Sequence, residues 1–236
     1  MLFLHRVFLI VWSSCFSRPI DNKMTTRGYN FFAGQRISRI EALSDGVFAI
    51  AMTLLVLDIK VPVGEFHSEG ELLSAFVPLL PKLLSYLLGF MTLGIFWVGH
   101  ATQFKFIGKT DRHLTWLNIF FLMVISVFPF STAFLSEHIH FKVAVGLYWL
   151  NIFLAGIALL IHWNYGCKAN LLDESVTTEE VFGAIQKRII IAQTLYLIAA
   201  LLCFVNTYLS VAMTILVQMN YALAVFFSPK GSEAEA

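Results

Sequence analysis

The sequence predicts an all-α, polytopic membrane protein with six transmembrane helices. Of its 236 residues, 58% are hydrophobic and only 13% are charged, whereas soluble chains carry about a quarter charged residues. The mean hydropathy is +0.76, and six apolar stretches each approach the roughly 20 residues that a helix needs to cross a bilayer core. An apolar excess of this size is accommodated in lipid rather than in a soluble core.

The composition also excludes several classes of function. The formal net charge is +1, from 16 Lys and Arg against 15 Asp and Glu. This balance argues against a nucleic-acid partner, because phosphate binding needs a concentrated basic surface. Cys15, Cys167 and Cys203 are scattered, and no CxxC, HExxH or Gly-rich phosphate-binding motif occurs. We therefore expect no metal site, no cofactor and no enzymatic activity.

The six predicted spans are 42–61, 76–99, 114–135, 143–165, 189–207 and 209–227. The last two form an almost continuous apolar run, which is interrupted only by Asn206, Thr207 and Tyr208. An unbroken helix of that length would overshoot the membrane about twofold, so a tight turn is predicted at this tripeptide. Pro129 lies inside the third span and is predicted to kink it, as membrane helices tolerate.

Lys and Arg residues are strongly biased to one side of these spans. Thirteen of the 16 lie in the N-terminal segment, the second and fourth loops and the C-terminal tail, and only Lys60, Lys82 and Lys142 lie on the other side. The positive-inside rule then places both termini in the cytoplasm of a multi-pass protein of the cell membrane. Thr177 and Glu180 are spaced as a capping box and predict a cytoplasmic extension of the fifth helix.

Three regions are predicted along the chain: a cytoplasmic or interfacial segment at 1–35, a six-helix domain at 36–228 and a cytoplasmic tail at 229–236. Residues 2–16 are apolar, but they are too few to span a bilayer and include His5 and Arg6. Either translation begins at Met24 and residues 1–23 are a start-site artefact, or this segment is an interfacial helix.

The first span carries a continuous stripe of aliphatic side chains. Relative to Ile50, about 100° of rotation per residue brings six positions close to its direction: Leu43, Gly46, Leu54, Leu57 and Val61, with Thr53 at the margin. Asp45 points to the opposite side of the helix. By itself such a stripe is typical of lipid contact or core packing, whereas an ionisable residue within a span indicates a functional position.

Three separated motifs resemble those of one known family. They are Arg39-x-x-x-Leu43-Ser44-Asp45-Gly46 in the first span, Phe96-Trp97-x-x-His100 in the second, and Trp116-Leu117-Asn118 followed by Phe128-Pro129-Phe130-Ser131-Thr132 in the third. Together they resemble the endosomal and lysosomal potassium channel family, the transmembrane protein 175 family, in its prokaryotic form. Its first-helix signature reads RxxxFSD, and Leu43 here replaces the aromatic residue. The likeness is strong over residues 36–135 and elsewhere rests on helix number and order.

This resemblance implies a potassium channel subunit that assembles as a homotetramer in the lipid bilayer and passes K⁺. In that family the first helix lines a central pore without a TVGYG filter, and this sequence contains no TVGYG. Carried over by position, the pore constriction falls on Ile50, Leu54 and Leu57, with the Thr53 hydroxyl beside it. These are residues of the stripe already found on the helical wheel.

Six polar or aromatic residues are assigned to a cluster that joins the first three helices behind the pore: Arg39, Ser44, Asp45, Trp97, His100 and Asn118. Arg39 and Asp45 are six residues apart and do not share one helix face, so their partners are expected on other helices. Two interpretations stay open: the cluster only fixes helix packing, or it takes part in gating.

Two other functions compete with a channel. The first is a proton-coupled transporter that uses Asp45 as its carrier site, although the paired repeats and broken helices common in transporters are not evident. The second is a membrane scaffold that conducts nothing. A voltage-gated channel is excluded, because no span carries regularly spaced arginines.

Overall fold

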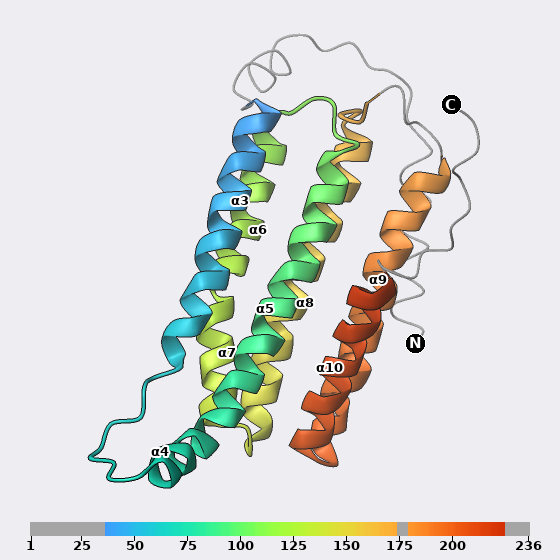
Figure 1. Ribbon diagram of the computed structural model, residues 1–236. Helices are drawn as coiled ribbons and strands as arrows, with labels where there is room; N and C mark the ends of the chain where they lie inside the picture. The colour runs from blue at the N-terminus through green and yellow to red at the C-terminus, as the bar shows by residue number, and fades with distance from the viewer. Residues whose placement is uncertain (1–35, 174–178, 225–236) are drawn as a thin grey trace, which may run out of the picture.

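A computed structural model describes residues 36–173 and 179–224, and in this part of the chain the fold is an all-helical bundle (Figure 1). The helices follow in the order α3 (Ile37–Leu54), η1 (Leu55–Asp58), α4 (Glu69–Phe76), η2 (Val77–Leu79), α5 (Leu80–Phe104), α6 (Arg112–Ser126), α7 (Phe128–Glu137), α8 (Lys142–Lys168), α9 (Glu179–Leu201), η4 (Leu202–Phe204) and α10 (Thr207–Ala224).

Five helical stretches among the described residues are long and apolar enough to cross a membrane: Ile37–Asp58, Glu69–Phe104, Arg112–Glu137, Lys142–Lys168 and Phe182–Phe204. Helix α10 follows these five stretches and runs antiparallel to α9, and Ala224 lies at the limit of the described residues. The predicted turn between the last two spans is confirmed. There the Asn206 side chain accepts hydrogen bonds from the backbone N–H groups of Tyr208 and Leu209.

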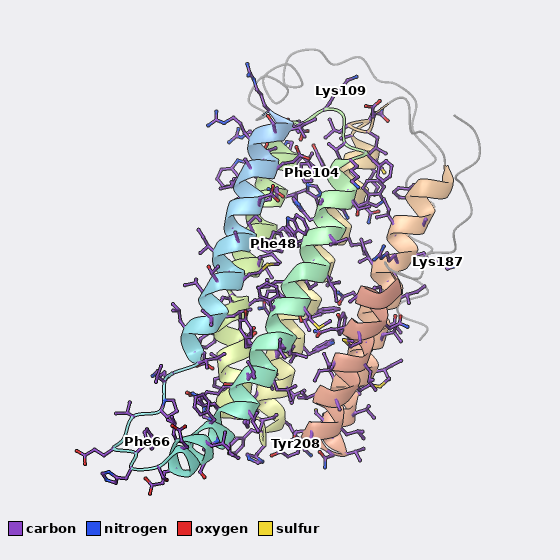
Figure 2. All side chains as sticks on the ribbon, in the orientation of Figure 1. Phe48, Phe66, Phe104, Lys109, Lys187 and Tyr208 are labelled. Carbon is purple, nitrogen blue, oxygen red and sulfur yellow. The ribbon has the colours of Figure 1, made fainter. Side chains whose placement is uncertain are left out.

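The arrangement places α3 and the α9–α10 pair at opposite edges of the bundle (Figure 1). Helices α5, α6, α7 and α8 lie between these edges, and α3 packs on α5 and α6. One continuous apolar core links the elements, with Phe48, Phe121, Phe128 and Leu93 almost fully buried. Figure 2 shows side chains along the whole length of the helices at both edges of the bundle.

The predicted end of the first span at Val61 is wrong, because the helix stops at Asp58. Pro62 explains the difference: the residue before a proline is disfavoured in the helical region. The last turn, Leu55–Asp58, is a tighter 3₁₀ helix, in which side chains three residues apart are nearly eclipsed. Val61 therefore leaves the stripe, whereas Leu57 comes into line with Leu54.

The second span is displaced along the chain relative to the predicted 76–99: α5 runs from Leu80 to Phe104, and a separate short helix, α4, precedes it. Helix α4 begins after Ser68, whose hydroxyl accepts from the Glu71 backbone N–H at 3.2 Å. The Glu71 carboxylate in turn accepts from the His67 N–H at 2.8 Å, so the start resembles a capping box. This Ser-x-x-Glu spacing is readable in the sequence. At the other end of the bundle, α9 begins at Glu179, and the predicted cap at Thr177 lies outside the described residues.

The predicted kink at Pro129 is confirmed as a break between α6 and α7 at Val127. The hydrogen-bonding network orients the Asn151 amide of α8 so that its nitrogen donates to Val124 O at 3.2 Å and its oxygen accepts from Phe128 N at 3.3 Å. These are the two backbone groups that an unbroken helix would pair with each other. The buried Asn151 side chain thus takes the place of one helical hydrogen bond inside the bundle.

Candidate functional site: the first helix and its polar contacts

Helix α3 has two apolar faces with opposite environments. One face is packed into the bundle and includes Ile40, Ser44, Phe48 and Ala51. The other face is uncovered along the length of the helix. Its exposed aliphatic residues and their exposed fractions are Leu43 at 51%, Ile50 at 60%, Leu54 at 45% and Leu57 at 68%.

The exposed face contains the predicted constriction residues Ile50, Leu54 and Leu57. Thr53 is also exposed, and its hydroxyl donates to the backbone of its own helix, to Ile50 O at 2.9 Å and Ala49 O at 3.0 Å. Because the hydroxyl proton is directed at the backbone, the oxygen lone pairs are what this residue offers to a cation. Gly46 has open space where a Cβ would lie, so another helix can approach closely here.

A buried hydrogen-bond chain ties α3 to α6 and α5. The Ser44 hydroxyl donates to Ile40 O at 2.8 Å, the Asn118 amide nitrogen donates to the Ser44 oxygen at 3.2 Å, and His100 Nε2 lies 2.7 Å from the Asn118 amide oxygen. Since an amide oxygen only accepts, His100 carries its proton on Nε2. The His100 ring also stacks on Phe121, with 5.2 Å between ring centroids. This chain fixes the rotation of α3 about its own axis.

A second contact between α3 and α5 lies at the surface. The Trp97 indole nitrogen donates to the Asp45 carboxylate at 2.8 Å, and both side chains are exposed. The Arg39 side chain is exposed and has no hydrogen bond or ion pair with any described residue. The six residues predicted as one cluster are therefore arranged as the chain Ser44–Asn118–His100, the pair Asp45–Trp97, and Arg39 apart from both.

Two buried polar groups were missed by the sequence analysis. In the first, His162 Nδ1 lies 3.0 Å from the Gln103 amide oxygen, and the Gln103 nitrogen donates to Leu159 O at 3.0 Å. This group joins α5 to α8, and it lies next to the buried chain because the His162 and His100 ring centroids are 6.0 Å apart. The available signal was the presence of polar residues within apolar spans, which marks positions that need partners.

The second missed group consists of Thr92, Tyr148 and Gln218, which are also buried. The Thr92 and Tyr148 hydroxyls are 2.6 Å apart, and the Gln218 amide of α10 donates to Thr92 Oγ1 and Leu88 O. This group joins the last helix to α5 and α8. Both missed groups join helices through polar side chains, as in other membrane bundles, although His162 Nε2 and Gln218 Oε1 are buried without a partner among the described residues. Neither group reaches the exposed face of α3.

These features define a class of protein before any relative is considered. The chain is a polytopic helical membrane protein in which the helix at one edge presents a long aliphatic face, while hydrogen bonds to two neighbouring helices hold its other side. A helix held in this way is suited to line an interface shared between identical subunits.

Comparisons with known proteins agree with this class. Residues 39–129 match the family described as endosomal/lysosomal potassium channel TMEM175. A potassium channel of Chamaesiphon minutus is 38% identical over 191 residues, which cover 78% of this chain and 93% of that protein. A crystal structure described as a lysosomal potassium-selective channel TMEM175 homolog from Chamaesiphon minutus superposes with a TM-score of 0.68 at 33% identity, covering 79% of this chain and 96% of that one.

More distant relatives carry a different description. The human protein named endosomal/lysosomal proton channel TMEM175 is 33% identical over 182 residues, which cover 72% of this chain but only 35% of that protein. The chain belongs to the TMEM175 family of ion channels.

Proposed function

We propose that this protein is a subunit of a potassium-conducting channel that assembles as a homotetramer around α3. The observation that carries the proposal is the exposed aliphatic face of α3, with Ile50 60% and Leu57 68% exposed in the single chain. The relatives named potassium channels in Chamaesiphon minutus and Streptomyces collinus support K⁺ as the permeant ion. The bias of Lys and Arg residues to one side of the spans supports a multi-pass protein of the cell membrane with both termini in the cytoplasm.

In this assembly, four copies of the exposed α3 face surround one axis. Ile50 and the eclipsed pair Leu54 and Leu57 narrow the path to an apolar neck, which opens and closes by wetting and dewetting. K⁺ gives up part of its hydration shell more readily than Na⁺ does, and Thr53 oxygens replace part of it. Selectivity is modest, because four hydroxyls are fewer ligands than a carbonyl filter supplies.

The hydrogen bonds on the buried side of α3 have a defined role in this mechanism. A rotation of α3 about its axis would turn Ile50 out of the neck, and the chain Ser44–Asn118–His100 opposes it because each link joins a different helix. The Asp45–Trp97 pair lies nearer the surface and adds a contact that can break without opening the core. We assign this pair to gating.

Proton conduction is the competing function, because the animal relatives are named proton channels. A proton-coupled transporter that uses Asp45 is a further alternative. The exposed aliphatic residues of α3 carry no group that binds a proton, so a proton path would need a continuous water file through the neck. Passive K⁺ permeation needs the neck to be wetted as well but needs no titrating residue in it.

The test is single-channel recording from purified protein in planar bilayers. The wild type should give unitary K⁺ currents that reverse with modest preference for K⁺ over Na⁺. Ile50→Asn should wet the neck, raise the conductance and bring the K⁺ and Na⁺ permeabilities closer together. Ile198→Asn is the matched control, because Ile198 is 48% exposed on α9 at the opposite edge of the bundle.

Each competing function gives a different result. Unchanged conductance and selectivity in Ile50→Asn would mean that Ile50 does not form the neck. Coupled ion flux without unitary events, abolished by Asp45→Asn, would identify a transporter. A reversal potential that follows a pH gradient and ignores K⁺ would identify a proton channel, and silence in every condition would favour a scaffold.

A further inference from the structure

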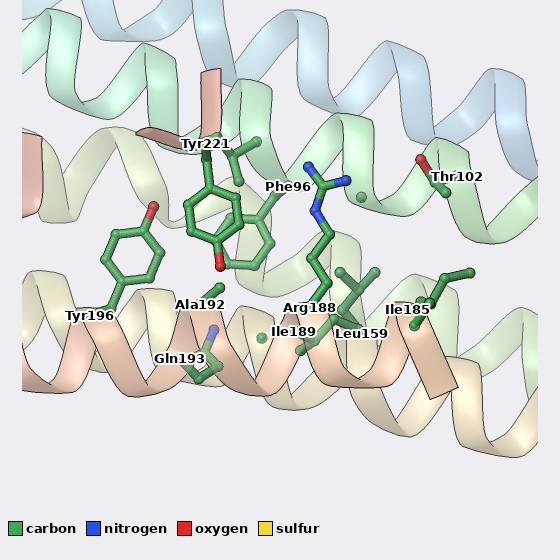
Figure 3. A pocket seen from close by; sticks show the side chains of 14 residues that line it. Phe96, Thr102, Leu159, Ile185, Arg188, Ile189, Ala192, Gln193, Tyr196 and Tyr221 are labelled. Carbon is green, nitrogen blue, oxygen red and sulfur yellow. The ribbon is translucent and has the colours of Figure 1, made fainter. Parts of the chain in front are cut away.

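A cavity lies between α5, α8, α9 and α10, at the edge of the bundle away from α3 (Figure 3). Its volume is about 210 Å³, which exceeds the roughly 150 Å³ of an engineered apolar cavity that binds benzene. Most of the wall is apolar, with Ile95, Phe96, Leu159, Ile189 and Ala192 among the lining residues. The cavity is therefore large enough and apolar enough to hold part of a hydrocarbon chain.

The lining residues are exposed at one end of the cavity and buried at the other. Ala184 and Arg188, towards the start of α9, are exposed, whereas Phe96 and Tyr196 are buried. From Ala184 to Tyr196 the helix rises about 18 Å, close to the roughly 15 Å thickness of one leaflet of the bilayer core. The length of the lined stretch therefore matches one acyl chain, with its polar end at the end of the bundle where α3 begins.

Arg188 gives the cavity a positive charge. Its side chain extends from α9 towards α5, with Tyr221 on one side and Thr102 on the other (Figure 3). The guanidinium carbon lies 5.8 Å from the Tyr221 ring centroid, a cation–π contact. No described carboxylate lies within ion-pair distance of the Arg188 guanidinium. The N–H groups of a guanidinium point outward in its own plane, and the face of the Tyr221 ring does not accept hydrogen bonds from them there.

The position of Arg188 in the membrane makes an anionic partner favourable. It lies within Phe182–Phe204, one of the stretches that can cross a membrane. A charged side chain at such a position is costly unless it pairs with an opposite charge or reaches the interface. A guanidinium binds a phosphate through two parallel hydrogen bonds, which is the strongest pairing open to it.

We propose that this cavity binds one anionic phospholipid, with its phosphate on Arg188 and one acyl chain along Ile189, Ala192 and Phe96. The apolar wall favours a lipid over a free anion, because inorganic phosphate has no hydrocarbon chain to bury against the apolar residues at the buried end of the cavity. A zwitterionic lipid carries the same phosphate, but its choline cation would lie close to Arg188 and offset part of the attraction, so an anionic lipid is favoured. The bound lipid would add contacts between α9 and α5, beside the places where these helices already pack through α8 and α10.

The test is lipid binding to the purified, delipidated protein, measured by native mass spectrometry during titration with dioleoyl phosphatidylglycerol. Arg188→Gln should weaken binding at least tenfold, and Arg188→Lys should restore part of it. Lys187→Gln is the matched control, because it removes the neighbouring exposed charge and lines no part of the cavity; its effect should stay below twofold. Ala192→Phe should weaken binding by filling the space for the acyl chain.

Two further titrations distinguish the sources of the anion and the chain. Dioleoyl phosphatidylcholine should bind at least tenfold more weakly than phosphatidylglycerol, and millimolar inorganic phosphate should not displace the bound lipid. Wild-type affinity in Arg188→Gln, equal binding of the two lipids, or displacement by inorganic phosphate would each overturn the proposal. Elution of every variant at the wild-type volume in size-exclusion chromatography shows that the fold and assembly are retained.

Discussion

Asn118 on α6 donates a hydrogen bond to Ser44 on α3 at 3.2 Å, and its amide oxygen lies 2.7 Å from His100 Nε2 on α5. One side chain therefore joins three helices, and all three residues are buried. No other described residue hydrogen-bonds through its side chain to both α3 and α5.

Replacement of Asn118 by Ala should lower the free energy of unfolding by about 1–3 kcal/mol, because His100 Nε2 and the Ser44 hydroxyl lose a partner in a buried site. Ser44→Ala should cost less, about 0.5–1.5 kcal/mol, since Asn118 keeps its contact with His100. Thermal unfolding in detergent measures both. Ile119→Ala, next in the chain and exposed, is the control, and equal losses for Asn118→Ala and Ile119→Ala would contradict the prediction.

The Asp45–Trp97 hydrogen bond should affect opening rather than assembly. Trp97→Phe removes the indole donor to the carboxylate and should change the open probability about fivefold, the effect of roughly 1 kcal/mol. Asp45→Ala should give a change of similar size. If the pair acts as a unit, the double variant should resemble either single variant in single-channel recording. Additive effects would mean that the two residues influence gating independently.

Leu57 should meet its copies near the shared axis of the tetramer. In a background with Cys15→Ser, Cys167→Ser and Cys203→Ser, oxidation of Leu57→Cys should form disulfide-linked dimers. Such a bond requires Cβ atoms about 3.5–4.5 Å apart, which only neighbouring copies of an axial residue provide.

Non-reducing gel electrophoresis of membranes detects the linked species. Ile198→Cys in the same background is the control, because α9 lies at the opposite edge of the bundle, and it should remain monomeric on the gel. A monomeric Leu57→Cys protein under the same oxidant would place this face of α3 away from the axis.

Asn151 should contribute to the stability of the protein because Pro129 breaks the helix beside it. Asn151→Leu leaves Val124 O and Phe128 N without the side-chain partner that bridges them, which should destabilise the protein by about 1–3 kcal/mol. In a Pro129→Ala background the two backbone groups can bond to each other, so the same Asn151→Leu change should cost less than half as much. Urea-induced or thermal unfolding of the four proteins measures this coupling, and equal costs in the two backgrounds would refute it.

The exposed stripe of α3 shows which features of a helix can be predicted from the sequence and which cannot. Helical periodicity alone placed Leu43, Ile50, Leu54 and Leu57 on one face, because the period is a local property of the backbone. The same reasoning wrongly included Val61, since apolar character continues past the residue at which Pro62 ends the helix. Which of the two faces is buried cannot be read from α3 alone, because both are predominantly apolar.

The polar residues show the same division. The presence of Asp45, His100 and Asn118 within apolar spans marked them as residues that need partners, because lipid offers none. Their pairing depends on the depth and rotation of each helix, so Trp97 rather than His100 contacts Asp45. Gln103 and His162 became recognisable as a group only once α5 and α8 were placed side by side.

The amino-acid sequence on its own determined the class of the protein, the approximate spans, the turn at Asn206, the break near Pro129 and the stripe on α3. Each of these follows from hydropathy, periodicity or local stereochemistry within a few turns of chain. Only the packed bundle decided that this stripe is uncovered, that Asn118 joins three helices, and that Arg188 lines a cavity between α5 and α9. Those relations join residues far apart in the chain, and they depend on how whole helices pack against one another.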